Sequence, residues 1–566
     1  MNLLLLILIA IGLLSLGYIV YGGLLSRWLH LRADTPTPAH QFKNDVDFVP
    51  THKFYLLNQH LSAIAAAGPI VGPILAGMWF GWLPTFIWII LGGIFIGGVH
   101  DMLSIVASIR QQGRSIAEVI RATMSHRAFI IFLLFLWFSL VYIIAAFTDV
   151  TASTFVEPVH GASIASSSML YLLLALIMGI ALRRFHLSLT LSTLISLPLV
   201  FACIYAGQLL PLTLPLVPGL DGRMTWNVAL LIYCFIAAVM PMWLLLQPRG
   251  YLGGFFLLIT VGVSFLGLLI GSLTNHLTIQ SPAFIGWHNS QGLPLLPILF
   301  ITVACGACSG FHCLIASGTT SKQLSKETDA KVVGYGGMLL ESFVAVIALS
   351  TLLILTKDEV ALLKDPNQIF ANGVATFLSH LGISKEFAFN FALLAFATFV
   401  YDTLDVATRL GRYIFEELTG WKNKLSPYVA TFATLILPFI FLTRKFIDAD
   451  GHVIPGWKVF WTVFGASNQL LAALVLFGLS LWLFKRGMRY KMALIPSIFM
   501  TFVAAISLFL IIKPWLINIF IKRIISFDPV GVTCLVLFAL TACLLVEGSR
   551  LFIQKDHKIN ERGNTC

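Results

Sequence analysis

Several ionisable side chains lie inside stretches of sequence that are otherwise apolar: His60, Asp101, Asp149, His312 and Glu341. A charge is costly where the surroundings exclude water, so these residues are the first candidates for chemistry. An imidazole titrates near neutral pH, and a carboxylate without a cation beside it in sequence needs a proton or a partner, which suits proton transfer. The alternative is a purely structural role for these residues. The histidines would then be buried side chains with their hydrogen bonds satisfied, and Asp101 would cap a helix or pair with Arg110.

The stretch from Asn58 to Phe80 has two Gly-Pro pairs in the middle of its apolar run, Gly68-Pro69 and Gly72-Pro73. Each proline removes an amide donor and each glycine loosens the backbone, so about one turn should leave the helix there. Lipid cannot satisfy the freed carbonyls, and such a break survives where protein covers it or where it lines a polar cavity, as in secondary transporters. A proline kink resolved by neighbouring helices is the alternative.

A second polar segment inside an apolar run reads ITVACGACSGFHCLIASGTTSK. Its candidate site residues are Ser309, Gly310, His312, Ser317, Thr319, Thr320 and Lys322. Hydroxyls and freed carbonyls are hard ligands for a small cation, although ordinary bonding of serine and threonine to a helix is the alternative. Lys322 is also the nearest cation candidate for Glu341. Cys305, Cys308 and His312 share a helix face, but buried cysteine is a common small apolar residue, so no metal site is predicted.

The elements that must position these residues are membrane helices. The chain has 566 residues, of which 58% are hydrophobic and 11% charged, with a mean hydropathy of +0.91, which excludes a soluble globular domain. Apolar runs of about 20 residues predict about fifteen spans. These spans cover residues 2–24, 58–80, 84–108, 128–153, 166–182, 187–209, 226–246, 250–272, 292–317, 333–356, 385–404, 426–444, 457–484, 490–513 and 528–552.

Charge gives the expected orientation of these spans. The formal net charge is +11, but the basic residues are scattered among short loops, so no nucleic acid partner is predicted. Successive loops between the predicted spans lie on alternate sides of the membrane. When the 36 Lys and Arg are assigned to these loops, most of them fall on one side, which is the expected cytoplasmic side. The amino terminus is then outside and the carboxyl terminus cytoplasmic. The first span is expected to stay as an anchor rather than to be a cleaved signal peptide.

The predicted fold class is an all-α polytopic membrane protein with a five-plus-five inverted-repeat core and extra helices at both ends. The expected parts are an extra helix at 1–30, the core at 58–410, extra helices at 424–553 and a charged, unstructured cytoplasmic tail at 554–566. The second half of the core is expected to open with the span at 226–246. Pro241 should interrupt that span and Pro248 should end it.

Six segments resemble the carbon starvation protein A (CstA) family of bacterial inner-membrane transporters. They are DVDFVPTHK, HLSAIAAAGPIVGPILA, VHDMLSIVASIRQQGRSIAEVI, ACGACSGFHCLIASGTTSK, VGYGGMLLESFVA and FGASNQLLAA, in this order over residues 45 to 474. The resemblance implies uptake of peptides or pyruvate during carbon starvation, with protons, on a fold like that of the APC superfamily. It places functional motifs on His60, Gly68 to Pro73, Asp101, Ser309 to His312, Ser317 to Lys322, Glu341, Asn468 and Gln469.

The sequence therefore predicts a proton-coupled secondary transporter in the bacterial inner membrane, with membrane lipid and a small organic substrate as partners and no cofactor. Sodium is the alternative coupling ion. A membrane sensor or scaffold is a second alternative, although no loop is long enough to hold an output domain. An enzyme is not predicted, because the chain has neither an H-E-x-x-H motif nor a nucleophile elbow. The short link between the spans at 333–356 and 385–404 leaves the substrate open, and the oligomeric state is also open.

Overall fold

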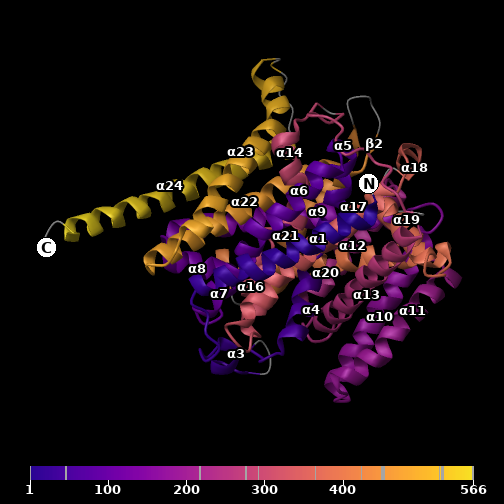
Figure 1. The fold of residues 1–566 in the computed structure, drawn as a ribbon, viewed down its shortest axis with the longest axis horizontal. Coiled ribbons are helices and arrows are strands. Elements are labelled where there is room, and N and C mark those ends of the chain that lie inside the picture. Colours follow the sequence, from indigo (N-terminus) through magenta and orange to yellow (C-terminus); the bar gives the residue numbers. More distant parts are fainter. Residues whose placement is uncertain are drawn as a thin grey trace.

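Long apolar helices, joined mostly by short loops, form the whole framework of the protein (Figure 1). The computed structural model describes residues 2–44, 48–215, 218–274, 277–290, 292–363, 365–421, 423–447, 453–521, 523 and 528–563. Within those residues, twelve helices are long and apolar enough to cross a membrane, and one bent pair makes a thirteenth span. The predicted all-helical, multi-pass class is confirmed. The total of about fifteen spans stays a prediction.

The long helices follow the predicted apolar runs closely, and several contain a π-helical turn. In sequence order they are α1 (Leu3–Leu16), η1 (Gly17–Tyr21) and α2 (Gly22–Trp28); α6 (Trp82–Gly92), η2 (Gly93–Gly97) and α7 (Gly98–Ile109); α9 (His126–Phe155); α10 (Gly161–Arg184); α11 (Leu189–Leu209); α12 (Gly222–Val239); α13 (Leu246–Leu273); η4 (Lys331–Tyr335) and α17 (Gly336–Leu353); α20 (Lys385–Thr419); α22 (Gly456–Lys485); α23 (Lys491–Phe520); and α24 (Pro529–Gly563). Helix α24 continues over most of the predicted tail, which was expected to be unstructured.

Shorter elements connect or interrupt these spans. They are α3 (Pro38–Gln41), α4 (Lys53–Ile64), α5 (Gly68–Phe80), α8 (Ile116–Thr123), α14 (Leu295–Thr302), α15 (Ala304–Ala307), α16 (His312–Gly318), η3 (Thr320–Lys322), α18 (Lys357–Leu363), α19 (Pro366–Ser379) and α21 (Ser426–Leu442). The strands β1 (Phe446–Ile447) and β2 (Val453–Ile454) form a small antiparallel hairpin.

Two spans are interrupted, and they cross each other. Helices α4 and α5 form one span that bends by 51° at residues 65–67, which confirms the predicted break. The break lies just before Gly68, because Pro69 occupies the first turn of α5, where its missing amide costs nothing. The second interrupted span is α14, α15 and α16. Helix α5 packs on α14 and α15 whereas α4 packs on α16, so the two spans are antiparallel, as inverted repeats predict.

The span predicted to open the second half of the core is not interrupted. Helix α12 is regular and ends at Val239, Pro241 lies in the turn that follows, and Pro248 lies in the first turn of α13. The prediction that Pro241 breaks a helix and Pro248 ends it was therefore wrong, because both prolines stand where the helical ladder needs no amide donor. The second break falls instead in the polar segment around Ser309, where glycine and serine replace proline as the weak points.

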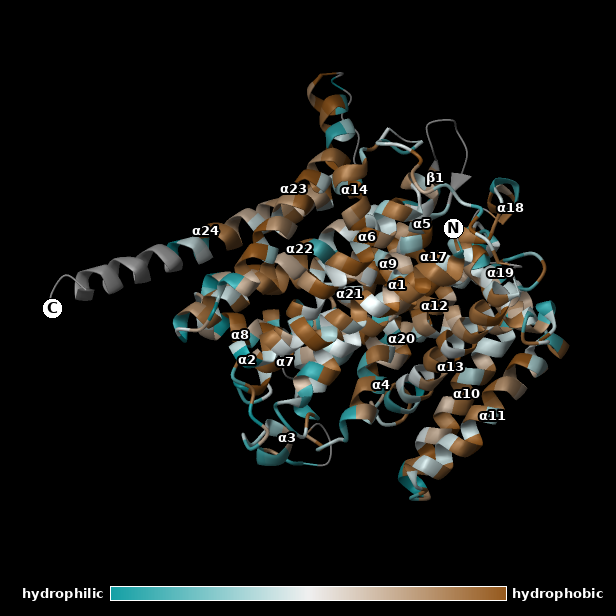
Figure 2. Ribbon diagram, in the orientation of Figure 1, coloured by the Kyte–Doolittle hydropathy of each residue, from teal (hydrophilic) through white to brown (hydrophobic). Residues whose placement is uncertain are grey.

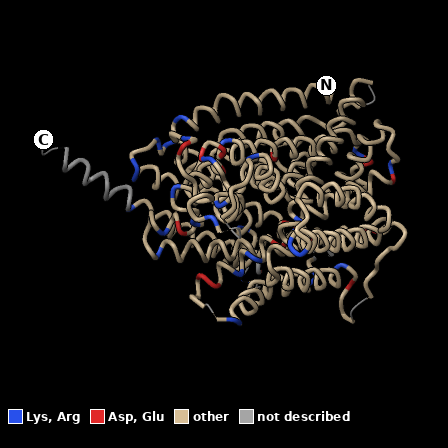
Figure 3. The backbone as a smooth tube through the Cα atoms, turned by 90° about the horizontal axis from the view of Figure 1, so that it is seen from below, with Lys and Arg blue, Asp and Glu red and all other residues tan. Residues whose placement is uncertain are grey.

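Polar and charged residues are distributed as a membrane requires. Hydrophobic residues cover the long helices, and hydrophilic ones concentrate at the connections, such as those around α3 and α8 (Figure 2). Lys and Arg gather mainly toward the side of the molecule where the carboxyl terminus lies (Figure 3). This asymmetry follows the charge bias that was read from the sequence.

The crossing of the two interrupted spans can be tested at Gly72. A Cβ atom there would clash with the carbonyl oxygen of Thr302 on the opposing span. We expect Gly72→Ala to destabilise the protein by about 1–3 kcal/mol, because the backbones would have to separate. Gly262→Ala is the control, since a Cβ there meets nothing within 4 Å. Thermal unfolding in detergent should show a lower melting temperature for Gly72→Ala alone, and equal melting temperatures would contradict the close contact.

Candidate functional site

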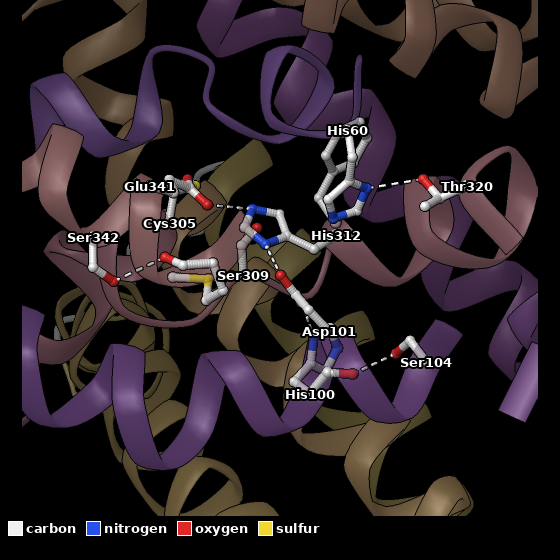
Figure 4. A network of polar contacts seen from close by, with 12 residues as sticks. His60, His100, Asp101, Ser104, Cys305, Ser309, His312, Thr320, Glu341 and Ser342 are labelled. Carbon is white, nitrogen blue, oxygen red and sulfur yellow. Dashed lines mark hydrogen bonds and ion pairs between the residues drawn. The ribbon is translucent and has the colours of Figure 1, made fainter. Parts of the chain in front are cut away.

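The imidazole of His312 lies between two carboxylates at the centre of the protein (Figure 4). Its Nδ1 atom is 2.8 Å from Oδ2 of Asp101, and its Nε2 atom is 3.1 Å from Oε2 of Glu341. All three side chains are fully buried. They come from three elements, α16, α7 and α17, and the break before α16 brings the first residue of that helix against the other two. The structure thus brings together three of the residues predicted from the sequence.

A second histidine completes the hydrogen bonding of Asp101. Nδ1 of His100 is 2.7 Å from Oδ1 of Asp101, so each carboxylate oxygen has one imidazole partner. The predicted alternative, pairing of Asp101 with Arg110, was wrong, because Arg110 lies 2.7 Å from Glu327 instead. The pairing of Glu341 with Lys322 was also not found, since His312 takes that place. Both alternatives relied on nearness in sequence, which does not decide which helix faces which.

The cluster can change its number of protons while remaining buried. With Nδ1–H of His312 directed at Asp101, Nε2 bears a proton only in the imidazolium form, which then faces Glu341. Two ionised carboxylates and one imidazolium leave a net charge of −1, and one more proton makes the group neutral. Burial away from water favours neutral groups. The number of protons that the cluster binds therefore depends on how far water is excluded from it.

His60 lies near the His312 cluster and makes a contact of its own with the second interrupted span (Figure 4). Its Nδ1 atom is 2.9 Å from the hydroxyl of Thr320, which joins α4 to η3. Both residues line a cavity of about 740 Å³. Lys322 lines the same cavity, with its ammonium 5.7 Å from the centre of the Phe48 ring. His60, Thr320 and Lys322 therefore line one cavity, and their role in binding stays a prediction.

Asn468 and Gln469 satisfy the backbone of the second interrupted span. Oδ1 of Asn468 accepts from the amide of Phe311 at 3.0 Å, and its Nδ2 donates to the hydroxyl of Ser309 at 3.0 Å. The amide of Gly310 donates to the Asn468 carbonyl at 3.1 Å. Gln469 donates to the carbonyl of Phe300. Both predicted residues lie at the interruption, and their hydrogen bonds hold its freed backbone groups.

The remaining predicted residues are also placed by the crossing. Gly68 and Gly72 lie at the contact between the two spans, where Cys305 and Thr302 leave no room for a Cβ atom. Pro69 begins α5 and Pro73 lies within it. Ser317 accepts from the amide of Ile116 at 2.9 Å, and Thr319 donates to the carbonyl of Ile315 at 3.1 Å. These last two contacts match the predicted alternative of ordinary serine and threonine bonding.

A second group of charged residues lines or adjoins the cavity. In the sequence, Asp402 and Asp405 stand beside Arg409 and Arg412, a pattern that favours a solvated intracellular charge network, but all four side chains are buried. Arg249, at the beginning of α13, is fully buried and pairs with Asp405. The phenol of Tyr233 donates to the same carboxylate at 2.8 Å. The missed signal was Arg249 itself, which directly precedes an apolar run and needs a partner.

Asp149 lies apart from the His312 cluster. It accepts from Nδ2 of Asn227 at 2.8 Å and from the amide of Trp457 at 2.8 Å. These bonds join α9, α12 and α22. Asp149 is therefore a satisfied buried carboxylate that ties three helices together.

Two interrupted membrane helices that cross beside a cavity, with an ionisable cluster at the crossing, define the general class of a membrane transporter. A family model described as carbon starvation protein CstA matches residues 2–370 and 355–507. The peptide transporter CstA of Helicobacter pylori strain J99 is 33% identical over 564 residues, which cover 88% of this chain and 79% of that protein. The pyruvate/proton symporter BtsT of Escherichia coli K12 is 31% identical over 526 residues, covering 78% of this chain and 71% of that protein.

The chain belongs to the CstA family. The relatives are named as transporters, so the predicted class, a multi-pass inner-membrane transporter rather than an enzyme, is confirmed. A crystal structure of a manganese transporter from Eremococcus coleocola aligns over 92% of this chain and 100% of that chain, at 13% identity and a TM-score of 0.48. That similarity is too low to assign a shared fold.

The buried His312 cluster should carry a large part of the stability of the core. Asp101→Asn removes the negative charge between His100 and His312, and we expect a loss of about 3 kcal/mol, because breaking a buried ion pair leaves its partner uncompensated. Asp365→Asn is the control, since Asp365 pairs with Lys458 at the surface, where both side chains are partly exposed, and should cost about 0.5 kcal/mol or less. Melting temperatures of the two purified variants check this, and equal shifts would contradict it.

Proposed function

We propose that this protein is a secondary active transporter that imports small organic nutrients, peptides and/or pyruvate, during carbon starvation. The names of the relatives, peptide transporter and pyruvate/proton symporter, support the substrate class. The observation that carries the proposal is the His312 cluster, which lies at the crossing of the two interrupted spans next to a cavity large enough for a small organic molecule.

The proton is the proposed coupling ion. An imidazole between two carboxylates offers three groups that exchange protons, and the number of protons bound by the three together decides whether the cluster is neutral. Sodium, the alternative ion, prefers a shell of oxygen ligands, and here the group between the two acids is an imidazole, hydrogen-bonded to Asp101 and 3.1 Å from Glu341. The similarity of the chain to a protein named as a pyruvate/proton symporter also supports the proton as the coupling ion.

The cavity also suggests the state of the transport cycle. It is lined by residues near the Lys- and Arg-rich connections, including Ser115, Arg183, Lys322 and Glu417. If this end is cytoplasmic, as the charge bias predicts, the amino terminus is outside, the carboxyl terminus is inside and the cavity faces the cytoplasm. Alternating access would then close this cavity and open the crossing from the other side.

Coupling can be tested with the purified protein in sealed proteoliposomes. We expect uptake of labelled tri-alanine or pyruvate to accelerate with an inward proton gradient and to be insensitive to replacement of external sodium by choline. Glu341→Gln keeps a hydrogen-bonding group but removes the ionisable one, so the response to the gradient should fall at least about tenfold. Glu386→Gln, at an exposed position in the first turn of α20, is the control for the same loss of charge away from the cluster.

Three outcomes would count against this proposal. Full proton dependence in both Glu341→Gln and His60→Ala would show that these residues do not couple the ion. Loss of uptake in choline at a fixed pH gradient would replace the proton by sodium. If the wild-type protein accumulates neither substrate although it folds and reconstitutes, a starvation sensor or scaffold becomes the better interpretation.

A further inference from the structure

Two charged residues that line the cavity form no direct ion pair. Asp402 and Arg409 both lie on α20, and both side chains are more than nine-tenths buried. Among the described residues, no opposite charge lies within 4.0 Å of either one. Arg249 lies close enough to act on the charge of Asp402, and Arg409 on that of Asp405, but the direct pair is Arg249 with Asp405. A buried charge without a partner is costly, so each group is a candidate to receive one from a ligand.

Asp402 faces the cavity as a hydrogen-bond acceptor. Its Oδ2 atom accepts from the hydroxyl of Ser62 at 3.0 Å, which is a neutral donor and leaves the charge of the carboxylate in place. Gly250 packs directly against it, since a Cβ atom there would be only 3.3 Å from Oδ1 of Asp402. Both residues line the cavity, so the carboxylate borders the cavity beside a glycine that carries no side chain to cover it. An ammonium group is the cation that best fits such an acceptor.

Arg409 is held in place without being neutralised. Its Nη2 atom donates to the carbonyls of Ala237 and Met240, both at 2.7 Å, at the end of α12. These two bonds use one nitrogen of the guanidinium and leave the donors on Nε and Nη1, of which Nε is buried without a partner. A guanidinium fixed in this way is suited to bind a carboxylate.

The separation of the two groups sets the length of the ligand. Seven helical residues place the Cα atoms of Asp402 and Arg409 about 10.5 Å apart along α20. An extended tripeptide spans about 10 Å and a dipeptide about 7 Å, and the long arginine side chain can lean toward the amino-terminal end of the helix to shorten the gap. Pyruvate has a carboxylate but no ammonium group, so it can contact only one of the two.

We propose that Asp402 and Arg409 bind the two termini of a peptide of two or three residues, with the free amino group at Asp402 and the carboxylate at Arg409. This inference rests on the proposed transport function and adds to it the residues that distinguish peptides from short organic acids. The cavity of about 740 Å³ lies within the range of sites for ligands much larger than pyruvate.

The test compares uptake of labelled tri-alanine, N-acetyl-tri-alanine and pyruvate into proteoliposomes that contain the full chain. In the wild type, acetylation of the amino group should lower uptake at least about tenfold relative to tri-alanine. Asp402→Asn should lower the ratio of tri-alanine to pyruvate uptake at least about tenfold, whereas Arg409→Gln should lower uptake of both substrates because both carry a carboxylate.

Two matched variants separate binding from structure. Glu386→Gln removes the same kind of charge from the same helix, but at an exposed position outside the cavity lining, and should leave the ratio unchanged. Ser62→Ala removes only the hydrogen bond to Asp402. If Ser62→Ala reproduces the effect of Asp402→Asn, the carboxylate acts through α4 and the inference is wrong.

Other outcomes are equally decisive. An unchanged ratio in Asp402→Asn, or equal loss of both substrates, would overturn the role of Asp402 while the transport function stands. A wild-type protein that transports pyruvate but not tri-alanine would also overturn the inference about peptide binding. The proposal that the protein is a transporter would then still stand. Uptake of neither substrate would overturn the transport function and the inference together.

Discussion

The close antiparallel contact of the two interrupted spans is the constraint on which the rest of the structure depends. At Gly72 the backbone of α5 reaches the carbonyl of Thr302, and any side chain there would push the spans apart. The interruption around Ser309 survives because Asn468 supplies both a donor and an acceptor to its freed backbone groups. Without that hydrogen bonding, unwound backbone inside a membrane would be too costly. The contact then places the first residue of α16 between two carboxylates.

Charge is distributed in two buried groups with different balance. In the first, His312 lies between Asp101 and Glu341, so its net charge follows the number of bound protons. In the second, two carboxylates and two guanidinium groups balance in number, Arg249 pairs directly with Asp405, and Asp402 and Arg409 line the cavity without a direct ion pair. The second group therefore has a fixed pair in its interior and two charges at the cavity wall.

Local chemistry made part of this structure predictable. Gly68-Pro69 and Gly72-Pro73 predicted a break because proline acts on its own turn, and the ionisable residues in apolar runs were predicted to be functional candidates because a lone charge there needs a proton or a partner. The partners were not predictable, since Arg110, Lys322 and His312 are equally plausible until the helices are packed. Asp402 and Asp405 were misjudged for a related reason: α20 continues to Thr419, well beyond the apolar run, so residues that look terminal lie between other helices.

Helix α4 carries contacts to both sides of the cavity. The imidazole of His60 contacts Thr320, which follows α16 in the second interrupted span, and the hydroxyl of Ser62 contacts Asp402 on α20. These two bonds leave the same short helix toward different partners, whereas α5, beyond the 51° bend, is held against the opposing span at Gly72. The cavity wall at His60 and the surroundings of Asp402 therefore both depend on the position of one helix of twelve residues.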